Sequence, residues 1–334
     1  MCISAAHPLS AADSQIERVN HRGWDGSYKI GNGVVQAIVV PAVGRVMQFS
    51  FKGETTGPFW ENPKLGGAPV QPQGSDWINF GGDKTWPSPQ DDWGKVTGRG
   101  WPPPQAFDSM SVTASTTAQS IILDSPVDSH FGIKTHREIT LRPGKAVMDI
   151  VTTYEKVREP AIKTGVWIIT QLASPEMVCV PLPAQSKMTN GYIKMSGDLP
   201  EAFQVKDGMI TLKRGTEKPT KIGTEGSTMV WVGPAHIVRI DSPRLPAAEY
   251  PDSGSSAQVY TNPDPLPYVE LEMLAPLHTL KVGDKISQTN TYSLYRRTRM
   301  ETMAQVRSVL TKSPEQTQRA TTPEAISCRE SARA

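Results

Sequence analysis

Two carboxylates stand two residues apart in the late segment YVELEML, residues 268–274, where they could divide acid and base roles. The segment has the pattern of a strand, so Glu270 and Glu272 fall on the same face. Same-face neighbours on a strand lie about 6.5–7 Å apart, and burial of one carboxylate of such a pair raises its pKa. The alternative is a solvated outer face with two surface charges.

A segment rich in tryptophan lies between residues 58 and 104, and its composition suits the binding of sugars. Sugars present C–H patches that pack on aromatic rings, and their hydroxyls bind amide, carboxylate and ammonium groups. The segment lacks period-two alternation but is rich in aromatic residues, so we expect a long, ordered, functional loop. Its candidate ligand-binding residues are Asn79, Asp83, Lys84, Trp86, Gln90, Trp93 and Trp101. Alternatively, the indoles form the hydrophobic core of the loop itself.

Further candidates lie in two strand patterns in the middle of the chain. Arg137 falls on the same face as the apolar Ile139, where a charge needs a partner: a sugar oxygen or phosphate, or an internal Asp or Glu. Trp167 shares a strand face with Gln171, so the two could extend the same ligand-binding surface. His130, in the turn before the first of these strands, is a candidate proton donor.

The composition argues against several classes of partner. Lys and Arg number 35 against 33 Asp and Glu, with no long basic run, so we expect no nucleic acid partner. No stretch approaches the roughly 20 apolar residues that span a bilayer, so we expect no membrane span. The 3 cysteines are far apart, which indicates neither a disulfide framework nor a cysteine-based zinc site.

Neither a metal nor a cofactor is expected. The GGDK stretch lacks the glycine spacing, the terminal Ser or Thr and the following helix of a nucleotide-binding loop. Asp83, Asp91 and Asp92 do not have the spacing of an EF-hand. A nucleophile motif of the G-x-S-x-G kind is also missing.

The apolar pattern predicts an all-β protein with one short helix. Short apolar runs separated by 29 Pro and 27 Gly residues predict many strands joined by turns, from Ser27 onward. Apolar residues at three- and four-residue spacing between Met300 and Leu310 predict a single C-terminal helix. The predicted strands include residues 34–40, 47–51, 132–141, 147–154, 162–171, 209–213, 229–232, 236–240, 268–274 and 285–294.

We expect one domain over residues 23–311. The segment 1–22 has small residues but neither a basic start nor a full apolar core, which leaves two interpretations open. One is the stub of a signal peptide, which implies a periplasmic or secreted protein, and the other is the disordered start of a cytoplasmic protein. The polar segment 312–334 has little to bury, so we expect a disordered tail.

Three segments of the chain resemble the galactose mutarotase-like superfamily, which includes aldose 1-epimerases and hexose-6-phosphate epimerases. They are GRVMQFSFKG at residues 44–53, GGDKTWPSPQDDWG at residues 81–94 and YVELEMLAPLHTLKVGDKISQTNTYSL at residues 268–294. The likeness spans residues 27–296, and the chain resembles an uncharacterised branch of that superfamily, a domain-of-unknown-function family. The resemblance implies an antiparallel β-supersandwich whose concave face receives a sugar ring.

The resemblance also implies an acid and base pair, a Glu and a His, that opens and recloses the sugar ring. Glu272 stands where the family places its catalytic base, ahead of the turn at residues 280–284. The motif GGDKTWP is similar to the segment that lines the sugar site in hexose-6-phosphate epimerases, and Arg45 in the first segment joins the ligand-binding candidates.

This chain departs from the family in the strand VWIITQLASP, residues 166–175, where mutarotases carry their general-acid His. Thr170, Gln171 and Leu172 stand there instead. A Gln amide does not exchange protons near neutral pH, so the family mechanism does not carry over unchanged.

Three hypotheses follow. The first is a protein of mutarotase-like architecture that binds a mono- or oligosaccharide, neutral, acidic or phosphorylated, in a concave cleft lined by the tryptophan-rich segment. The second is a sugar epimerase or another carbohydrate-active enzyme in which Glu272 is the base and Glu270, His130 or an unidentified Lys or Tyr supplies the proton. The third is an interaction scaffold whose tryptophan-rich segment docks on another protein.

Overall fold

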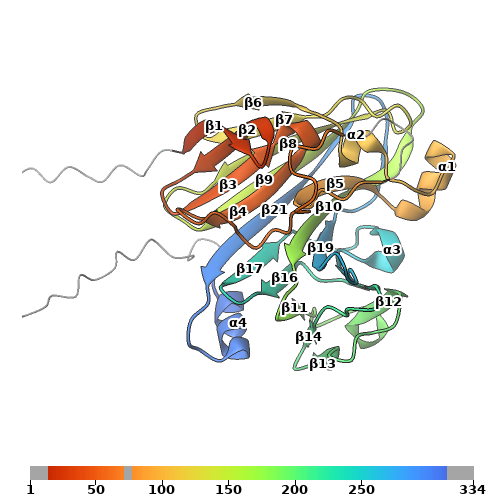
Figure 1. The fold of residues 1–334 in the computed structure, drawn as a ribbon. Helices are drawn as coiled ribbons and strands as arrows, with labels where there is room; N and C mark the ends of the chain where they lie inside the picture. The colour runs from red at the N-terminus through yellow and green to blue at the C-terminus, as the bar shows by residue number, and fades with distance from the viewer. Residues whose placement is uncertain (1–13, 71–76, 314–334) are drawn as a thin grey trace, which may run out of the picture.

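Two antiparallel sheets form the fold, and the computed structural model describes residues 14–70 and 77–313. Residues 1–13 and 314–334 lie outside the described residues. The structure therefore does not bear on the two interpretations of the N-terminal segment or on the expected disordered tail over these residues. Figure 1 shows both sheets, and the predicted all-β fold of antiparallel sandwich type is confirmed.

In the first sheet the strands lie in the order β1-β2-β3-β4-β5-β10-β19-β18-β15-β12, and β20 pairs with β10. Their bounds are β1 Gln15–His21, β2 Trp24–Gly31, β3 Val35–Val40, β4 Arg45–Phe51, β5 Asp83–Ser88, β10 Ile162–Ala173, β12 Tyr192–Ser196, β15 Thr220–Thr224, β18 Ala257–Thr261, β19 Tyr268–Leu274 and β20 His278–Leu280.

In the second sheet the order is β13-β14-β11-β16-β17-β21-β9-β8-β7-β6. The bounds are β6 Thr113–Thr116, β7 Ser120–Asp124, β8 Ile133–Leu141, β9 Val147–Lys156, β11 Met177–Pro181, β13 Gln204–Lys206, β14 Met209–Leu212, β16 Thr228–Val232, β17 His236–Asp241 and β21 Lys285–Arg296.

The helices are short, and the longest one that is described is the helix predicted from the sequence. Their bounds are α1 Trp93–Thr97, α2 Gln105–Asp108, α3 Pro251–Gly254 and α4 Thr302–Thr311, with 3-10 turns η1 Pro41–Val43, η2 Gln90–Asp92 and η3 Thr189–Gly191. In the described ranges no helix has the length and apolar composition to cross a lipid bilayer.

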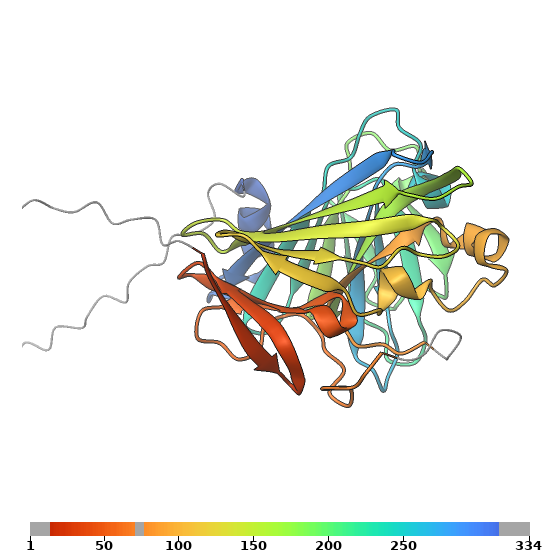
Figure 2. The same cartoon turned by 90° about the horizontal axis from the view of Figure 1, so that it is seen from above.

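The C-terminal helix α4 forms because its N-terminus is capped and one of its faces is apolar. The Glu301 carboxylate accepts hydrogen bonds from the backbone N–H groups of Met303, at 2.9 Å, and Ala304, at 2.8 Å, which otherwise lack partners at a helix start. Val306 and Val309 are buried against apolar residues of the second sheet. Helices α1 and α4 lie at opposite ends of the molecule (Figures 1 and 2).

The main hydrophobic core lies between the two sheets. Strand β8 shows how the sequence builds it, because its buried residues alternate strictly with half-buried ones. Ile139 of β8 packs in the same cluster as Phe49 of β4 and Leu271 of β19, on the other sheet. Burial of each such side chain contributes about 1.5–3 kcal/mol to the stability of the fold.

Several of the described strands form where the sequence predicted none, and β5 and β1 are two of them. The segment expected to be a loop contains β5, which pairs with β4 and β10 in the middle of the first sheet. All of its residues are buried, but apart from Pro87 they are polar or aromatic, so it has no apolar period. Strand β1 starts before the expected domain boundary at residue 23, and it is a partly exposed edge strand paired only with β2.

A buried polar cluster joins the two sheets beneath β5. Asp83 is fully buried, and its carboxylate pairs with the Arg137 guanidinium from β8. The same carboxylate accepts hydrogen bonds from Thr170 Oγ1 at 2.7 Å and from the Tyr292 hydroxyl at 2.6 Å. The pKa of Tyr292 lies well above its ordinary value, because of its burial and then because of the charge of Asp83. This cluster links β5 and β10 of the first sheet to β8 and β21 of the second.

We predict that replacing Asp83 by Ala lowers the free energy of unfolding by about 3–5 kcal/mol, because it leaves the Arg137 guanidinium buried without a counter-charge. Guanidinium chloride unfolding followed by tryptophan fluorescence measures the change. The control is Glu249→Ala, which removes an exposed ion pair with Lys163 and should cost less than about 1 kcal/mol. Equal effects of the two substitutions would show that the cluster does not hold the sheets together.

Candidate functional site

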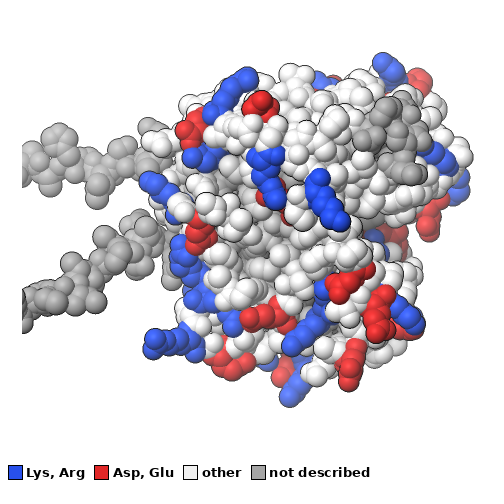
Figure 3. Space-filling view, viewed as in Figure 1, with Lys and Arg blue, Asp and Glu red and all other residues white. Residues whose placement is uncertain are grey.

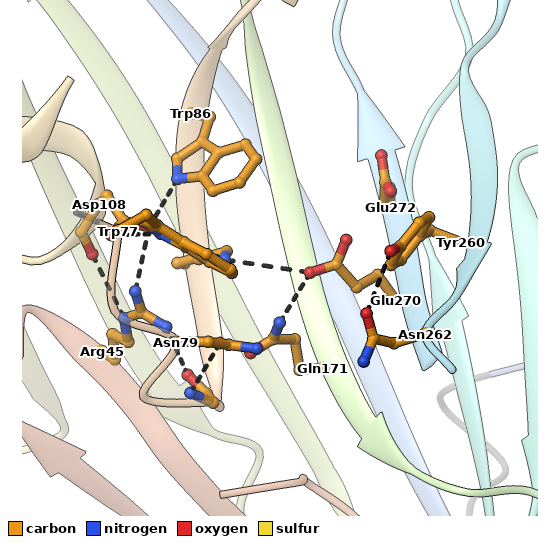
Figure 4. A network of polar contacts seen from close by, with 12 residues as sticks. Arg45, Trp77, Asn79, Trp86, Asp108, Gln171, Tyr260, Asn262, Glu270 and Glu272 are labelled. Carbon is orange, nitrogen blue, oxygen red and sulfur yellow. Dashed lines mark hydrogen bonds and ion pairs between the residues drawn. The ribbon is translucent and has the colours of Figure 1, made fainter. Parts of the chain in front are cut away.

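One face of the first sheet, opposite to the Asp83 cluster, carries a group of charged, amide and indole side chains that we call the charged face. Lys84 of β5 pairs with Ile169 of β10, and Ile169 pairs with Glu272 of β19, so the three point to the same side of the sheet. The charged face consists of Lys84, Trp86, Trp167, Gln171, Lys221, Gln258, Tyr260, Glu270 and Glu272. Figure 4 shows part of it.

Glu272 is fully buried on this face, and its two carboxylate oxygens have different surroundings. Oε2 accepts a hydrogen bond from Trp167 Nε1 at 2.8 Å and lies 2.9 Å from Lys221 Nζ. Oε1 is buried without a protein partner. Burial raises the pKa of Glu272 to about 7 although the Lys221 ammonium opposes this shift, and the neighbouring Glu270 carboxylate adds to it. A carboxyl with this pKa can give and take a proton near neutral pH.

Glu270, two residues earlier, is bound by different groups. Its Oε1 accepts a hydrogen bond from Gln171 Nε2 at 2.7 Å and lies 4.0 Å from Lys84 Nζ, and its side chain is 10% exposed. Gln171 stands where the resemblance leads one to expect a general-acid His. In this chain the Gln171 side chain instead orients the Glu270 carboxylate through this hydrogen bond.

Lys84 is the buried cation of the face. Its Nζ lies 4.2 Å from the ring centroid of Trp86 and 4.8 Å from that of Trp77, so it is held against two indoles. The Asp108 carboxylate is 3.7 Å from this Nζ, and Nζ makes no hydrogen bond within the described protein. Burial lowers the pKa of Lys84 to about 8, although the Asp108 carboxylate opposes the shift.

Asp108, at the end of α2, is a site residue that the sequence did not reveal. Its Oδ1 accepts from Trp86 Nε1 at 2.8 Å and from Arg45 Nη2 at 3.0 Å, and its Oδ2 accepts from Trp77 Nε1 at 3.1 Å. Burial alone would raise the pKa of Asp108, but the charges of Arg45 and Lys84 and the indole N–H donors outweigh burial and lower it. Asp108 follows the GWPPPQ stretch without any pattern that marks an acceptor.

Two similar clusters of a lysine, an indole and a carboxylate therefore lie next to each other. In one, the Lys221 ammonium lies 4.6 Å from the Trp167 ring centroid, and Glu272 binds both residues. In the other, Lys84 lies over Trp86, and Asp108 binds the indole N–H. The rings of Trp86 and Trp167 meet edge to face at 5.3 Å. Only the second cluster leaves its ammonium without a hydrogen bond.

Buried polar atoms without a protein partner gather on the charged face. They are rare in folded proteins, so a cluster of them calls for an explanation. Those on this face are Lys84 Nζ, Gln171 Oε1, Gln258 Oε1 and Glu272 Oε1, which come from four neighbouring strands. One is a donor and three are acceptors.

Several predicted site residues lie beside the charged face or away from it. Asp83 and Arg137 bind each other between the sheets, which is the internal ion pair that the sequence left open for Arg137. The Arg45 guanidinium is fully buried and is bound by Asp108 and the Gly81 carbonyl. His130 is exposed in the turn before β8. For these four residues, we favour positioning or surface roles.

The tryptophans of the predicted loop that lie outside the charged face differ in how far they are buried. Trp93 is fully buried and donates to the Pro87 carbonyl, so it belongs to the core of its own segment. Trp101 is 48% exposed and stacks on Trp93 with 6.4 Å between centroids. Asn79 is buried next to the charged face, where its Oδ1 accepts from the Gly81 N–H, and Gln90 lies half-buried in η2.

On the side shown in Figure 3, basic and acidic side chains are interspersed over the surface. Over residues 14–70 and 77–313, no group of three or more His, Cys, Asp or Glu side chains is placed to hold a metal ion.

We predict that Glu272 makes the stability of the protein depend on pH. The folded state keeps this carboxyl protonated up to about pH 7, whereas its ordinary value is 4.5, so protonation favours the folded state. This contribution is complete below pH 4.5 and is lost as the pH rises through about 7. Urea unfolding of wild type and Glu272→Gln across this range should show the dependence in the wild type and its loss in the variant. Identical pH profiles would mean that Glu272 ionises normally.

The comparisons with known proteins agree with this architecture. The family model described as Domain of unknown function (DUF4380) matches residues 27–295. No curated protein sequence matches the chain. Among solved structures, a galactose mutarotase-like protein from Lactobacillus casei ATCC 334 is similar with a TM-score of 0.55 and 10% identity, covering 81% of this chain and 100% of that one.

A candidate aldose 1-epimerase from Escherichia coli K12 is similar with a TM-score of 0.53 and 14% identity, covering 81% of this chain and 99% of that chain. Another from Klebsiella pneumoniae subsp. pneumoniae MGH 78578 gives a TM-score of 0.53 at 9% identity, covering 89% and 85%. Such low identities show the fold alone. The chain therefore has the mutarotase-like fold and belongs to the family described as Domain of unknown function (DUF4380).

Proposed function

We propose that this protein binds a carbohydrate on the charged face. The observation that carries the proposal is the cluster of buried polar atoms without protein partners, which lies beside indole rings. Three unpartnered acceptors, on Gln171, Gln258 and Glu272, suit the hydroxyl donors of a sugar, and Lys84 Nζ suits a sugar oxygen. A ligand with hydroxyls on neighbouring carbons satisfies several of these atoms at once.

The acidic end of this face is partly exposed to solvent. The side chains of Glu270 and Lys221 are 10% and 16% exposed, and Tyr260 is half-buried. Of the indoles, Trp86 and Trp167 are almost fully buried, so we assign them to the floor of the site. The more exposed Trp101 is the one that offers a free ring to the C–H face of a sugar.

We predict saturable quenching of tryptophan fluorescence by a neutral hexose such as D-galactose or D-glucose, with calorimetry as the second measurement. Gln258→Met removes one unpartnered acceptor and should weaken binding about five- to tenfold, the effect of losing one hydrogen bond of about 1 kcal/mol. Gln204→Met, at an exposed position of β13, is the matched control. A flat response to neutral, acidic and phosphorylated sugars alike would refute carbohydrate binding.

A second candidate function, sugar epimerisation, is favoured by the state of Glu272. This buried carboxyl has a pKa of about 7, so at neutral pH it can accept a proton from an anomeric hydroxyl and return it. The mutarotase-like fold supports this candidate only as an analogy.

For this candidate, we predict that the protein accelerates the exchange of α- and β-hexose anomers and that Glu272→Gln abolishes the acceleration, because an amide cannot act as a base. Exchange spectroscopy by NMR measures the rate. The acceleration should increase as the pH rises through about 7, where Glu272 becomes ionised. A wild-type rate equal to the uncatalysed one would exclude this reaction for the sugars tested.

A further inference from the structure

Lys84 differs from the other fully buried lysine in the described chain. The Lys156 ammonium donates a hydrogen bond to the Phe131 carbonyl, whereas the Lys84 ammonium has no hydrogen-bond acceptor. Burying a charged group without hydrogen bonds is costly, and such an ammonium usually serves a purpose beyond packing.

The contacts of Lys84 neutralise its charge but leave its N–H groups available. Its Nζ is 3.7 Å from Asp108 and 4.0 Å from Glu270, longer than the roughly 2.7–2.9 Å of a charge-assisted hydrogen bond. The indoles of Trp77 and Trp86 contribute attraction through their ring faces and accept no proton.

A role as a counter-ion for Asp108 does not explain Lys84. Asp108 already binds the Arg45 guanidinium at 3.0 Å and accepts from the indole N–H groups of Trp77 and Trp86. This carboxylate is therefore satisfied without Lys84.

Lys84 and Glu272 stand in one row of the sheet, on the two sides of Ile169. Two strand spacings separate their Cα atoms by about 10 Å, and both side chains are long enough to reach a ligand lying over β10. Each has one buried end without a protein partner, the Lys84 ammonium and Glu272 Oε1. The two groups are thus placed to act on one ligand from two sides.

We propose that Lys84 is the catalytic acid of this site and replaces, from a different strand, the histidine that is missing at Gln171. The inference rests on the proposed function, and specifically on its epimerase form.

In the proposed step Glu272 Oε1 accepts the proton of the anomeric hydroxyl, and the electron pair of that O–H bond forms the carbonyl at C1. The bond between C1 and the ring oxygen breaks, and the ring oxygen takes a proton from the Lys84 ammonium. After rotation about the C1–C2 bond, the ring closes on the other face of C1. Lys84 then takes its proton back, and Glu272 returns its proton to O1.

The burial of Lys84 favours this cycle. Burial lowers the pKa of Lys84 to about 8, with Asp108, Glu270 and Glu272 opposing the shift and Arg45 adding to it. An ammonium with this pKa gives up a proton at neutral pH far more readily than an exposed lysine does.

Anomer exchange of D-galactose and D-glucose, followed by NMR in wild type, Lys84→Met and Lys84→Arg, tests the proposal. We expect both variants to lose the acceleration by about 100-fold or more, the usual contribution of a general acid. Lys84→Arg keeps the charge, but a guanidinium does not release its proton, so it separates proton transfer from electrostatic attraction. Lys163→Met, at an exposed position of the same sheet, should retain the wild-type rate.

Two further measurements separate catalysis from folding and from binding. Circular dichroism melting checks that the variants fold, and fluorescence titration should show a loss of sugar affinity of about tenfold at most, the effect of one lost hydrogen bond. In Lys84→Ala, added methylamine should restore exchange in proportion to its concentration, which a structural role would not allow. The wild-type rate should also decline above about pH 8, and this decline should be absent from the residual rate of Lys84→Met.

The outcomes are distinct. Exchange by Lys84→Met within threefold of the wild-type rate overturns the role of Lys84, and so does a wild type that binds sugar but does not exchange its anomers. Absence of any sugar binding overturns the proposed function itself.

Discussion

The contact between Asp83 and Arg137 is the constraint on which the site depends. This ion pair holds β5 against the second sheet, and the Asp83 carboxylate also accepts hydrogen bonds from the hydroxyls of Thr170 and Tyr292. Because consecutive strand residues point to opposite faces, holding Asp83 on the inner side places Lys84 on the charged face. A one-residue shift of β5 would exchange the two, so this ion pair also fixes the register of the strand that supplies the buried ammonium.

The charged face, together with the neighbouring Arg45 and Asp108, combines burial with an even balance of charge. Arg45, Lys84 and Lys221 oppose Asp108, Glu270 and Glu272, and five of these six residues are buried. A set of charges buried this deeply would be unstable if any were unpaired, so each has at least one opposite charge nearby. The balance is not complete at the level of hydrogen bonds, because Lys84 Nζ and Glu272 Oε1 remain without protein partners. A ligand on this face would supply the missing hydrogen bonds of these two atoms.

Much of the fold could be predicted from the sequence, and the site in part. Strands such as β8 and β19 have buried residues that are mainly apolar, which the sequence reveals. Strand β5 is equally buried, but its residues make polar contacts on one side and belong to the candidate site on the other. Because it lacks alternating apolar residues, the sequence predicted a loop there. Asp108 was missed because its importance comes from Arg45, Trp77 and Trp86, which reach it only in the folded chain. Whether the residues expected to bind a ligand do so stays a prediction.

Burial acts in opposite directions on the two groups that stand on either side of Ile169. It raises the pKa of Glu272 to about 7 and lowers that of Lys84 to about 8, because in both cases the neutral form is favoured in the interior. Two groups whose ordinary pKa values, 4.5 and 10.5, differ by 6 thereby have pKa values that lie close to each other and to neutrality. General acids and bases are most efficient when their pKa values lie near the working pH. A histidine is one side chain with a pKa near neutrality, and a lysine enclosed by two indoles is another. Lys84 could therefore exchange a proton with a ligand on this sheet, which the amide of Gln171 cannot do.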